Sequence, residues 1–141
     1  MAKVFMGKVL IPGDQIEDYL QTMEKTEKNR ETFRKMLEGF NQDFEAYLIE
    51  QFSVRTARKH SYKVALFIDF LCWNTDVKSI DEITRGIANS YFRKWYMSKI
   101  GDCSETELKS AIKKFFQFLA EKKGIMNEKV MMSFRAHGRL G

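Results

Sequence analysis

The stretch from Ser53 to Trp73, SVRTARKHSYKVALFIDFLCW, changes character halfway along its length. It is basic and polar as far as Lys63, and from there it is almost wholly apolar apart from Asp69. Ser53 is a favourable N-cap, so the stretch predicts a helix that begins there. We expect the second half of this helix to be buried on all sides and the first half to emerge from the core with a basic face.

The positions of the apolar residues predict which side of this helix faces the core. On a helix with about 3.6 residues per turn, Arg55, Lys59 and Lys63 lie opposite the apolar stripe. Phe70 and Trp73 make that opposite side apolar in the second half. The predicted stripe comprises Val54, Ala57, Ser61, Val64, Ile68 and Leu71.

The segment before this helix also predicts helical structure. Pro12 is the one proline, and sustained alternation of β-branched residues is absent beyond the first eleven residues. Asp14 and Glu17 form a capping-box pattern, and Gly39 is a plausible stop signal, so we expect a long helix from about 15 to 38. A second, short helix is expected within NQDFEAYLIEQF, with its apolar side chains pointing together; these are Phe44, Tyr47, Leu48 and Phe52.

Three further helices are expected after the polar loop NTDVKS. The first has Thr84 as its N-cap and ends at Gly101, with Ile87, Tyr91, Trp95 and Ser98 at helical intervals. The second begins with the capping box of Ser104 and Glu107 and ends at Gly124. Its apolar face comprises Leu108, Ala111, Ile112, Phe115, Phe118 and Leu119. The third is a short helix in the tail, around Val130, Met131 and Phe134. We expect one core that contains Phe67, Phe70, Leu71, Tyr91, Trp95, Phe115 and Leu119.

Composition limits the class of protein. The chain has 141 residues, 44% of them hydrophobic, and a formal net charge of +5, which fits one basic domain with a real core. Its longest apolar run, Val64 to Ile68, is far shorter than the ~20 residues of a membrane span. The N-terminal residues make a poor secretory signal, so we expect a cytoplasmic protein.

Motifs that carry catalysis or bind metals are absent from the sequence. There is no HExxH, no phosphate-cradling glycine-rich loop, no CxxC pair and no nucleophile elbow. Cys72 and Cys103 have no spacing to either histidine that is typical of metal ligands. We therefore expect a protein that is not an enzyme and that holds no cofactor and no metal.

The order of these helices resembles a known family. Residues 44–125 are similar to the N-terminal core-binding domain of tyrosine recombinases (phage integrases), a SAM-like four-helix module. The resemblance lies in an F-x-x-Y-L core at Phe44, the pair Ser53 and Thr56, the mid-helix Tyr62, and an F-x-x-F-L pattern at Phe67. The I-x-x-I-T pattern at 80–84 and the F-F-x-F-L pattern at 115–119 complete it.

This resemblance implies an all-α fold, a small helical bundle of the SAM-like core-binding type with an extra N-terminal helix. We expect an extension at 1–40, the core-binding domain at 41–125 and a tail at 126–141. Recombinases follow this module with a catalytic domain that supplies arginines, histidines, a lysine and a tyrosine nucleophile. The present chain ends shortly after Gly124, so we expect no strand transfer by it.

The resemblance also implies a partner, duplex DNA, which core-binding domains contact with helices that touch phosphates and the major groove. Carried over to this chain, the DNA-binding residues are Arg55, Thr56, Lys59, Lys63, Thr106, Lys109, Ser110 and Lys113. The alternative is a helical protein-interaction module, with dimerisation through the helix at 15–38. Because SAM-like bundles serve both uses, the fold does not decide between them.

Overall fold

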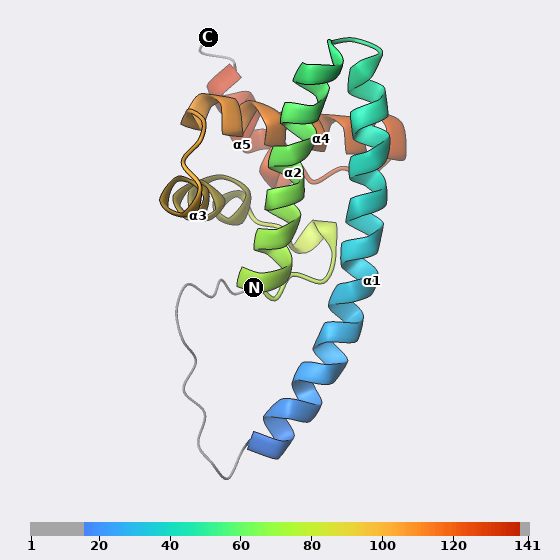
Figure 1. The fold of residues 1–141 in the computed structure, drawn as a ribbon, viewed down its shortest axis with the longest axis vertical. Coiled ribbons are helices and arrows are strands. Elements are labelled where there is room, and N and C mark those ends of the chain that lie inside the picture. The colour runs from blue at the N-terminus through green and yellow to red at the C-terminus, as the bar shows by residue number, and fades with distance from the viewer. Residues whose placement is uncertain (1–15, 139–141) are drawn as a thin grey trace.

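The structure, a computed structural model, describes the backbone of residues 16–138. It describes the side chains in that range except those of residues 16, 19, 20, 22–27, 29 and 135–138. The described residues form helices and short turns without any strand, which confirms the all-α prediction (Figure 1). The elements are α1 (Ile16–Ile49), α2 (Val54–Asn74), a 3₁₀ turn (Ile80–Glu82), a π turn (Ile87–Tyr91), α3 (Phe92–Lys99), α4 (Glu105–Lys123) and α5 (Glu128–Gly138). None of the described helices is both long and apolar enough to cross a membrane.

Helices α1 and α2 form an antiparallel pair, and α4 crosses behind them (Figure 1). Two arginines of α1 fix the position of the pair at its lower end. Arg34 Nη1 lies 2.8 Å from Asp69 Oδ1, and Arg30 Nη2 donates to the carbonyl oxygen of Thr75 at 3.1 Å. Beyond Arg30, the first part of α1 extends past the end of α2 (Figure 1).

Aromatic side chains fill the space between the helices. Phe67 of α2 meets Phe92 of α3 with ring centroids 5.0 Å apart, and Phe44 of α1 meets Phe115 of α4 at 5.3 Å, both edge to face. Such contacts contribute stability beyond the area that they bury. The core prediction is confirmed for Phe67, Phe70, Leu71, Phe115 and Leu119, and Trp95 packs half-buried against the core.

Gly39 does not end a helix, so the prediction of two helices before Ser53 is wrong. α1 runs through Gly39 because its buried stripe continues on both sides of it, with Phe33 and Leu37 before and Phe44 and Leu48 after. Burial of this stripe against α2 and α4 outweighs the ~1 kcal/mol that a glycine costs inside a helix. Val54, which was expected on the buried stripe, is exposed as the first residue of α2, and Phe52, which was expected to point together with Phe44, is exposed in the turn before it. The expected cap Asp14 lies outside the described residues.

The segment before α3 has one more residue in its helical turn than an α-helix has, and this changes which side chains are buried. Thr84 caps it as predicted, since its Oγ1 accepts from the N–H of Ile87 at 3.1 Å. The following turn is a π turn, which adds one residue to the helical repeat. As a result Phe92 and Tyr96 enter the core, and Tyr91 is 46% exposed, so its predicted burial is wrong.

The last two helices follow the prediction. Ser104 caps α4 by accepting from the N–H of Glu107 at 3.1 Å, and all six predicted residues of its apolar face are buried. Gly101 and Gly124 have φ values of +62° and +67°, as expected of stop residues. In the tail, Val130, Met131 and Phe134 are buried on α5.

Asn127 attaches α5 to the rest of the bundle, a role that the sequence analysis missed. Its Oδ1 accepts from the N–H of Val130 at 3.1 Å as the cap of α5. Its Nδ2 donates to the carbonyl oxygens of Ile80 and Ile83, at 2.8 and 2.9 Å. The division into 1–40, 41–125 and 126–141 stays a prediction, and α1 crosses its first boundary without a break.

Candidate nucleic-acid interface

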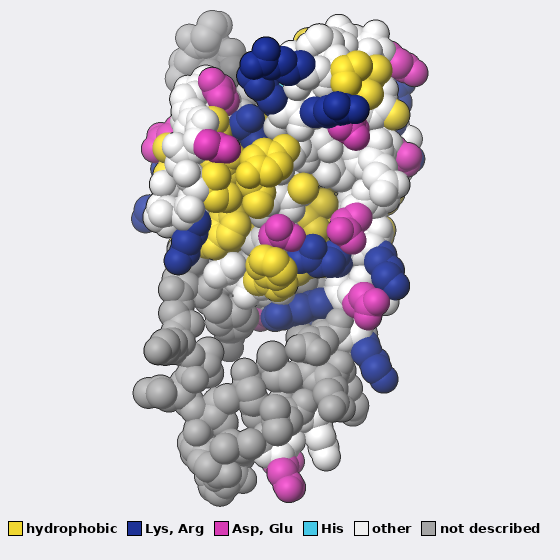
Figure 2. Space-filling view, viewed as in Figure 1, with side chains coloured by type: hydrophobic (Ala, Val, Ile, Leu, Met, Phe, Trp, Pro, Cys, Tyr) yellow, Lys and Arg dark blue, Asp and Glu magenta, His cyan; other side chains and the backbone are white. Residues whose placement is uncertain are grey.

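The exposed side of α2 carries a basic hollow close to its N-terminus. Ser53 Oγ accepts from the N–H of Thr56 at 3.1 Å, so α2 begins where the sequence predicted. The hollow has a volume of about 530 Å³ and is lined by Val54, Arg55, Arg58, Lys59 and Tyr62. Figure 2 shows Lys and Arg side chains at this end of the molecule, where α1 ends and α2 begins, as well as farther along the same face. Arg55 and Lys59 are therefore placed as predicted, on a solvent-facing surface.

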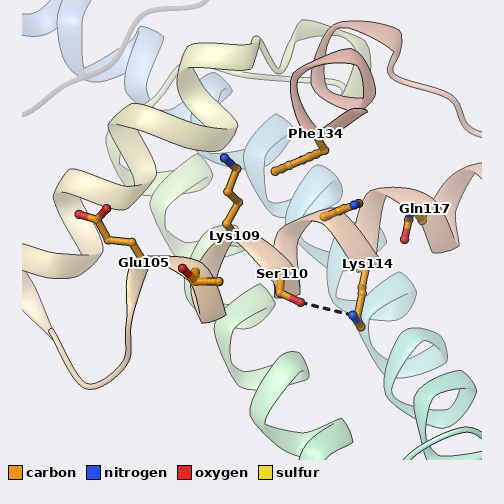
Figure 3. A pocket seen from close by; sticks show the side chains of 8 residues that line it. Glu105, Lys109, Ser110, Lys114, Gln117 and Phe134 are labelled. Carbon is orange, nitrogen blue, oxygen red and sulfur yellow. Dashed lines mark hydrogen bonds between the residues drawn. The ribbon is translucent and has the colours of Figure 1, made fainter. Parts of the chain in front are cut away.

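The first half of α4 carries a second hollow, of about 550 Å³ (Figure 3). It brings together all four residues that were predicted on this helix, and its lining comprises Glu105, Thr106, Lys109, Ser110, Lys113, Lys114, Gln117 and Phe134. Lys114 Nζ donates to Ser110 Oγ at 3.3 Å. Phe134 of α5 points toward the α4 side and forms the apolar wall (Figure 3). Ammonium and hydroxyl groups on one helical face form a suitable surface for phosphate oxygens.

Lys114 connects the two helices that carry these hollows. Its Nζ lies 5.9 Å from the ring centroid of Phe52, just before α2 begins. It also acts on His60 of α2, because burial first, and then the charges of Lys114 and Lys63, lower the pKa of that imidazole. The N-terminal halves of α2 and α4 are thus neighbours, with a cation between them.

Lys63 is the one predicted site residue that the structure buries. It is 7% exposed, and its Nζ donates to the carbonyl oxygen of Lys59 at 3.4 Å. The prediction that Lys63 lies on the exposed basic face is therefore wrong. The helical wheel separated it from the apolar stripe, but position 63 lies one turn before the buried Phe67, whose ring contacts Phe116 of α4.

The hydroxyl groups of the predicted set differ in their surroundings. Thr56 is half-buried, and its Oγ1 accepts from Ser53 Oγ at 3.0 Å within the cap. Thr106 is exposed and Ser110 is half-buried, and both line the hollow of α4. The sequence analysis missed Arg58 and Lys114, although Arg58 lies one turn after Arg55 and Lys114 directly follows Lys113.

Among the described residues, no group of three or more His, Cys, Asp or Glu side chains could hold a metal ion. A family model described as "Phage integrase, N-terminal SAM-like domain" matches residues 42–123, which is more than half of the chain. The chain belongs to this family. The match begins within α1 and ends with the last residue of α4, so it includes every lining residue of both hollows except Phe134. Neither the curated proteins nor the solved structures compared with the chain gave a match.

Membership of the phage integrase SAM-like family confirms the resemblance on which the sequence analysis relied. It identifies the chain as a core-binding module related to recombinases. The family model concerns an N-terminal domain, and the catalytic chemistry of recombinases was expected from a separate domain.

Proposed function

We propose that the chain binds duplex DNA through the basic side chains of α2 and α4, and that it does not itself cut or join strands. The observation that carries the proposal is the hollow on α4, where Lys109, Lys113 and Lys114 lie with the hydroxyl groups of Thr106 and Ser110. Family membership supports it, because the matched region contains these lysines and hydroxyl groups of α4.

Electrostatics explain why these positions suit DNA. Each ammonium or guanidinium group that contacts a phosphate releases condensed counterions, and this release supplies most of the affinity of a sequence-independent complex. The N–H groups at the start of a helix add a favourable field for anions. Arg55 and Lys59 lie near the start of α2, and Lys109 lies near the start of α4.

The test is a fluorescence anisotropy titration of a labelled duplex at several salt concentrations. With four or five phosphate contacts, the slope of log K against log salt should be about −4, and affinity should be micromolar or weaker. The double substitution Lys59→Gln, Lys113→Gln should flatten this slope by about two, because it removes two contacts. Circular dichroism should show an unchanged fold, because Lys59 is exposed and Lys113 is only half-buried, and charges at such positions contribute little to stability.

Lys78→Gln with Lys129→Gln is the matched control. Both lysines are exposed, and both lie near the end of α2 that is opposite Ser53. Lys78 lies in the loop after α2. Lys129 lies two residues after Asn127, whose side chain donates to the carbonyl oxygen of Ile80 in the turn that follows this loop. This control loses the same net charge and should keep the slope within about half a unit. Absence of binding at low salt, or equal effects of the two double substitutions, would contradict the proposal.

The alternative function, a protein-interaction module that dimerises through α1, rests on a different observation. The first part of α1 extends past the end of α2 (Figure 1), and Trp73 is 66% exposed at that end, with Arg34 5.2 Å from its ring centroid. Tryptophan and arginine are the residues most often found at interface hot spots. Light scattering after size exclusion tests it: a concentration-dependent dimer that Trp73→Ala weakens would favour this reading.

A further inference from the structure

Arg93 of α3 lies beside the first turn of α4, next to the hollow already described. Its Nη1 is 3.8 Å from Oε2 of Glu105. Arg93, Glu105 and Lys109 also line a small cleft between α3 and α4. Because Glu105 and Lys109 line the larger hollow as well, the cleft and the hollow share a wall. Arg93 thus adds a guanidinium group, from a different element, to the cations of α4.

The π turn accounts for the position of Arg93. The N–H of Phe92 reaches the carbonyl oxygen of Ile87, five residues back, and Phe92 then enters the core. Arg93 follows directly and lies half-buried on the α4 side. Without the extra residue of the π turn, every later side chain of α3 would be rotated by about 100°, and Arg93 would leave α4.

The cations at this junction are not fully neutralised within the described residues. Lys109 lies close enough to Arg93 and Lys113 that their charges lower its pKa, after the larger effect of burial. Glu105 is the acidic side chain that lines both the cleft and the hollow; its contact with Arg93 is long, and its own side chain is largely exposed to solvent. Exposed ion pairs of this kind are weak and are readily replaced.

We propose that Arg93, Lys109 and Lys113 form a site for a single phosphate group at the α3–α4 junction. In the absence of phosphate, Glu105 pairs with Arg93, and a bound phosphate replaces this carboxylate. A guanidinium group suits this role because it can bind two phosphate oxygens at once, while each ammonium group acts as a point charge. The identification of the phosphate as one from the DNA backbone rests on the proposed function above.

The first experiment measures the site without DNA. In the full chain, NMR titration of the lysine side chains should show that Arg93→Gln raises the pKa of Lys109, because a neighbouring positive charge is removed. Inorganic phosphate added to the wild-type protein should shift the signals of Arg93 Nε and Lys109 Nζ together. An unchanged pKa of Lys109 in Arg93→Gln, or phosphate shifts spread evenly over all lysines, would overturn the site.

The second experiment uses the labelled duplex. Arg93→Gln should reduce the salt slope by about one, as the loss of one phosphate contact does. Glu105→Gln should tighten binding about two- to five-fold, because it removes the competing carboxylate. Lys78→Gln, which removes an exposed charge in the loop after α2, is the control and should change neither value appreciably.

The two experiments separate the site from its proposed source of phosphate. If the wild-type protein binds duplex and Arg93→Gln behaves like Lys78→Gln, the site is wrong and DNA binding stands. If the duplex does not bind while inorganic phosphate shifts Arg93 and Lys109, the site stands and the DNA-binding function is wrong.

Discussion

His60 lies at the contact between α2 and α4, where two cations act on it. Its Nδ1 is buried without a hydrogen-bond partner, and burial, then Lys114, then Lys63, lower its pKa below the usual 6.5. Neutral imidazole is therefore favoured in the folded state. Because the unfolded chain takes up its proton first as pH falls, this group contributes stability above pH ~6.5 that is lost as pH falls toward the folded-state pKa.

His60→Gln should remove this dependence. Urea denaturation at pH 5, 6 and 7 should show that the wild-type protein loses more stability toward pH 5 than the variant does, because glutamine does not titrate. Carboxylates also titrate near pH 5, but they are common to both proteins and cancel in the comparison. Parallel pH profiles would contradict the assigned environment of His60.

Substitution of Phe70 tests, at the scale of a single residue, how much the core contributes to stability. It is fully buried on α2, with ring contacts to Phe92 and Trp95 at 5.6 and 5.5 Å. Phe70→Ala should cost about 3 kcal/mol or more in the free energy of unfolding, from lost burial and the cavity left behind. Phe52→Ala, at a position 41% exposed, is the matched control and should cost less than about 1 kcal/mol. Equal costs would place Phe70 outside the core.

At the scale of whole helices, Gly39 and Gly124 test two different roles of glycine. Gly39 tests the cost of a glycine inside a helix, and Gly124 tests the need for a glycine where the backbone has a positive φ. Gly39 lies inside α1, and a Cβ built there meets nothing within 4 Å, whereas Gly124 ends α4 with a φ of +67°. Gly39→Ala should therefore stabilise the protein by about 0.5–1 kcal/mol, and Gly124→Ala should destabilise it by about 1 kcal/mol. Thermal denaturation of both variants measures the difference, and a destabilising Gly39→Ala would mean that α1 is interrupted there.

The same elements show what the sequence could and could not predict. Ser53, Ser104 and Gly124 act through bonds and backbone angles within their own turns, so local sequence was enough to place them. Gly39 carries the same local signal, but burial of the α1 stripe on α2 and α4 overrides it. The π turn depends on which of two aromatic side chains, Tyr91 or Phe92, fits the core, and helical periodicity contains no information about that choice.

At the scale of the whole molecule, the candidate site was predictable helix by helix but not across helices. All four predicted residues of α4 line one hollow because they share a helical face, which periodicity determines. Lys63 was predicted to be exposed, and Arg93 was not predicted as a site residue. Both failures have the same cause, because the surroundings of each side chain include residues of another helix. The burial of Lys63 and the place of Arg93 beside α4 therefore required the packing of the bundle before they could be described.

We expect no strand transfer at the hollows of α2 and α4. Tyr62 lines the hollow of α2, so its hydroxyl group lies beside the proposed path of DNA. Strand transfer by tyrosine recombinases was expected to need a catalytic domain with its own arginines, histidines and lysine, and the matched family model concerns the N-terminal domain. Incubation with a nicked duplex that traps covalent intermediates, followed by a denaturing gel, should therefore show free protein and uncut DNA. An adduct that disappears in Tyr62→Phe would show instead that the module has a nucleophile of its own, because phenylalanine keeps the ring and removes the attacking oxygen.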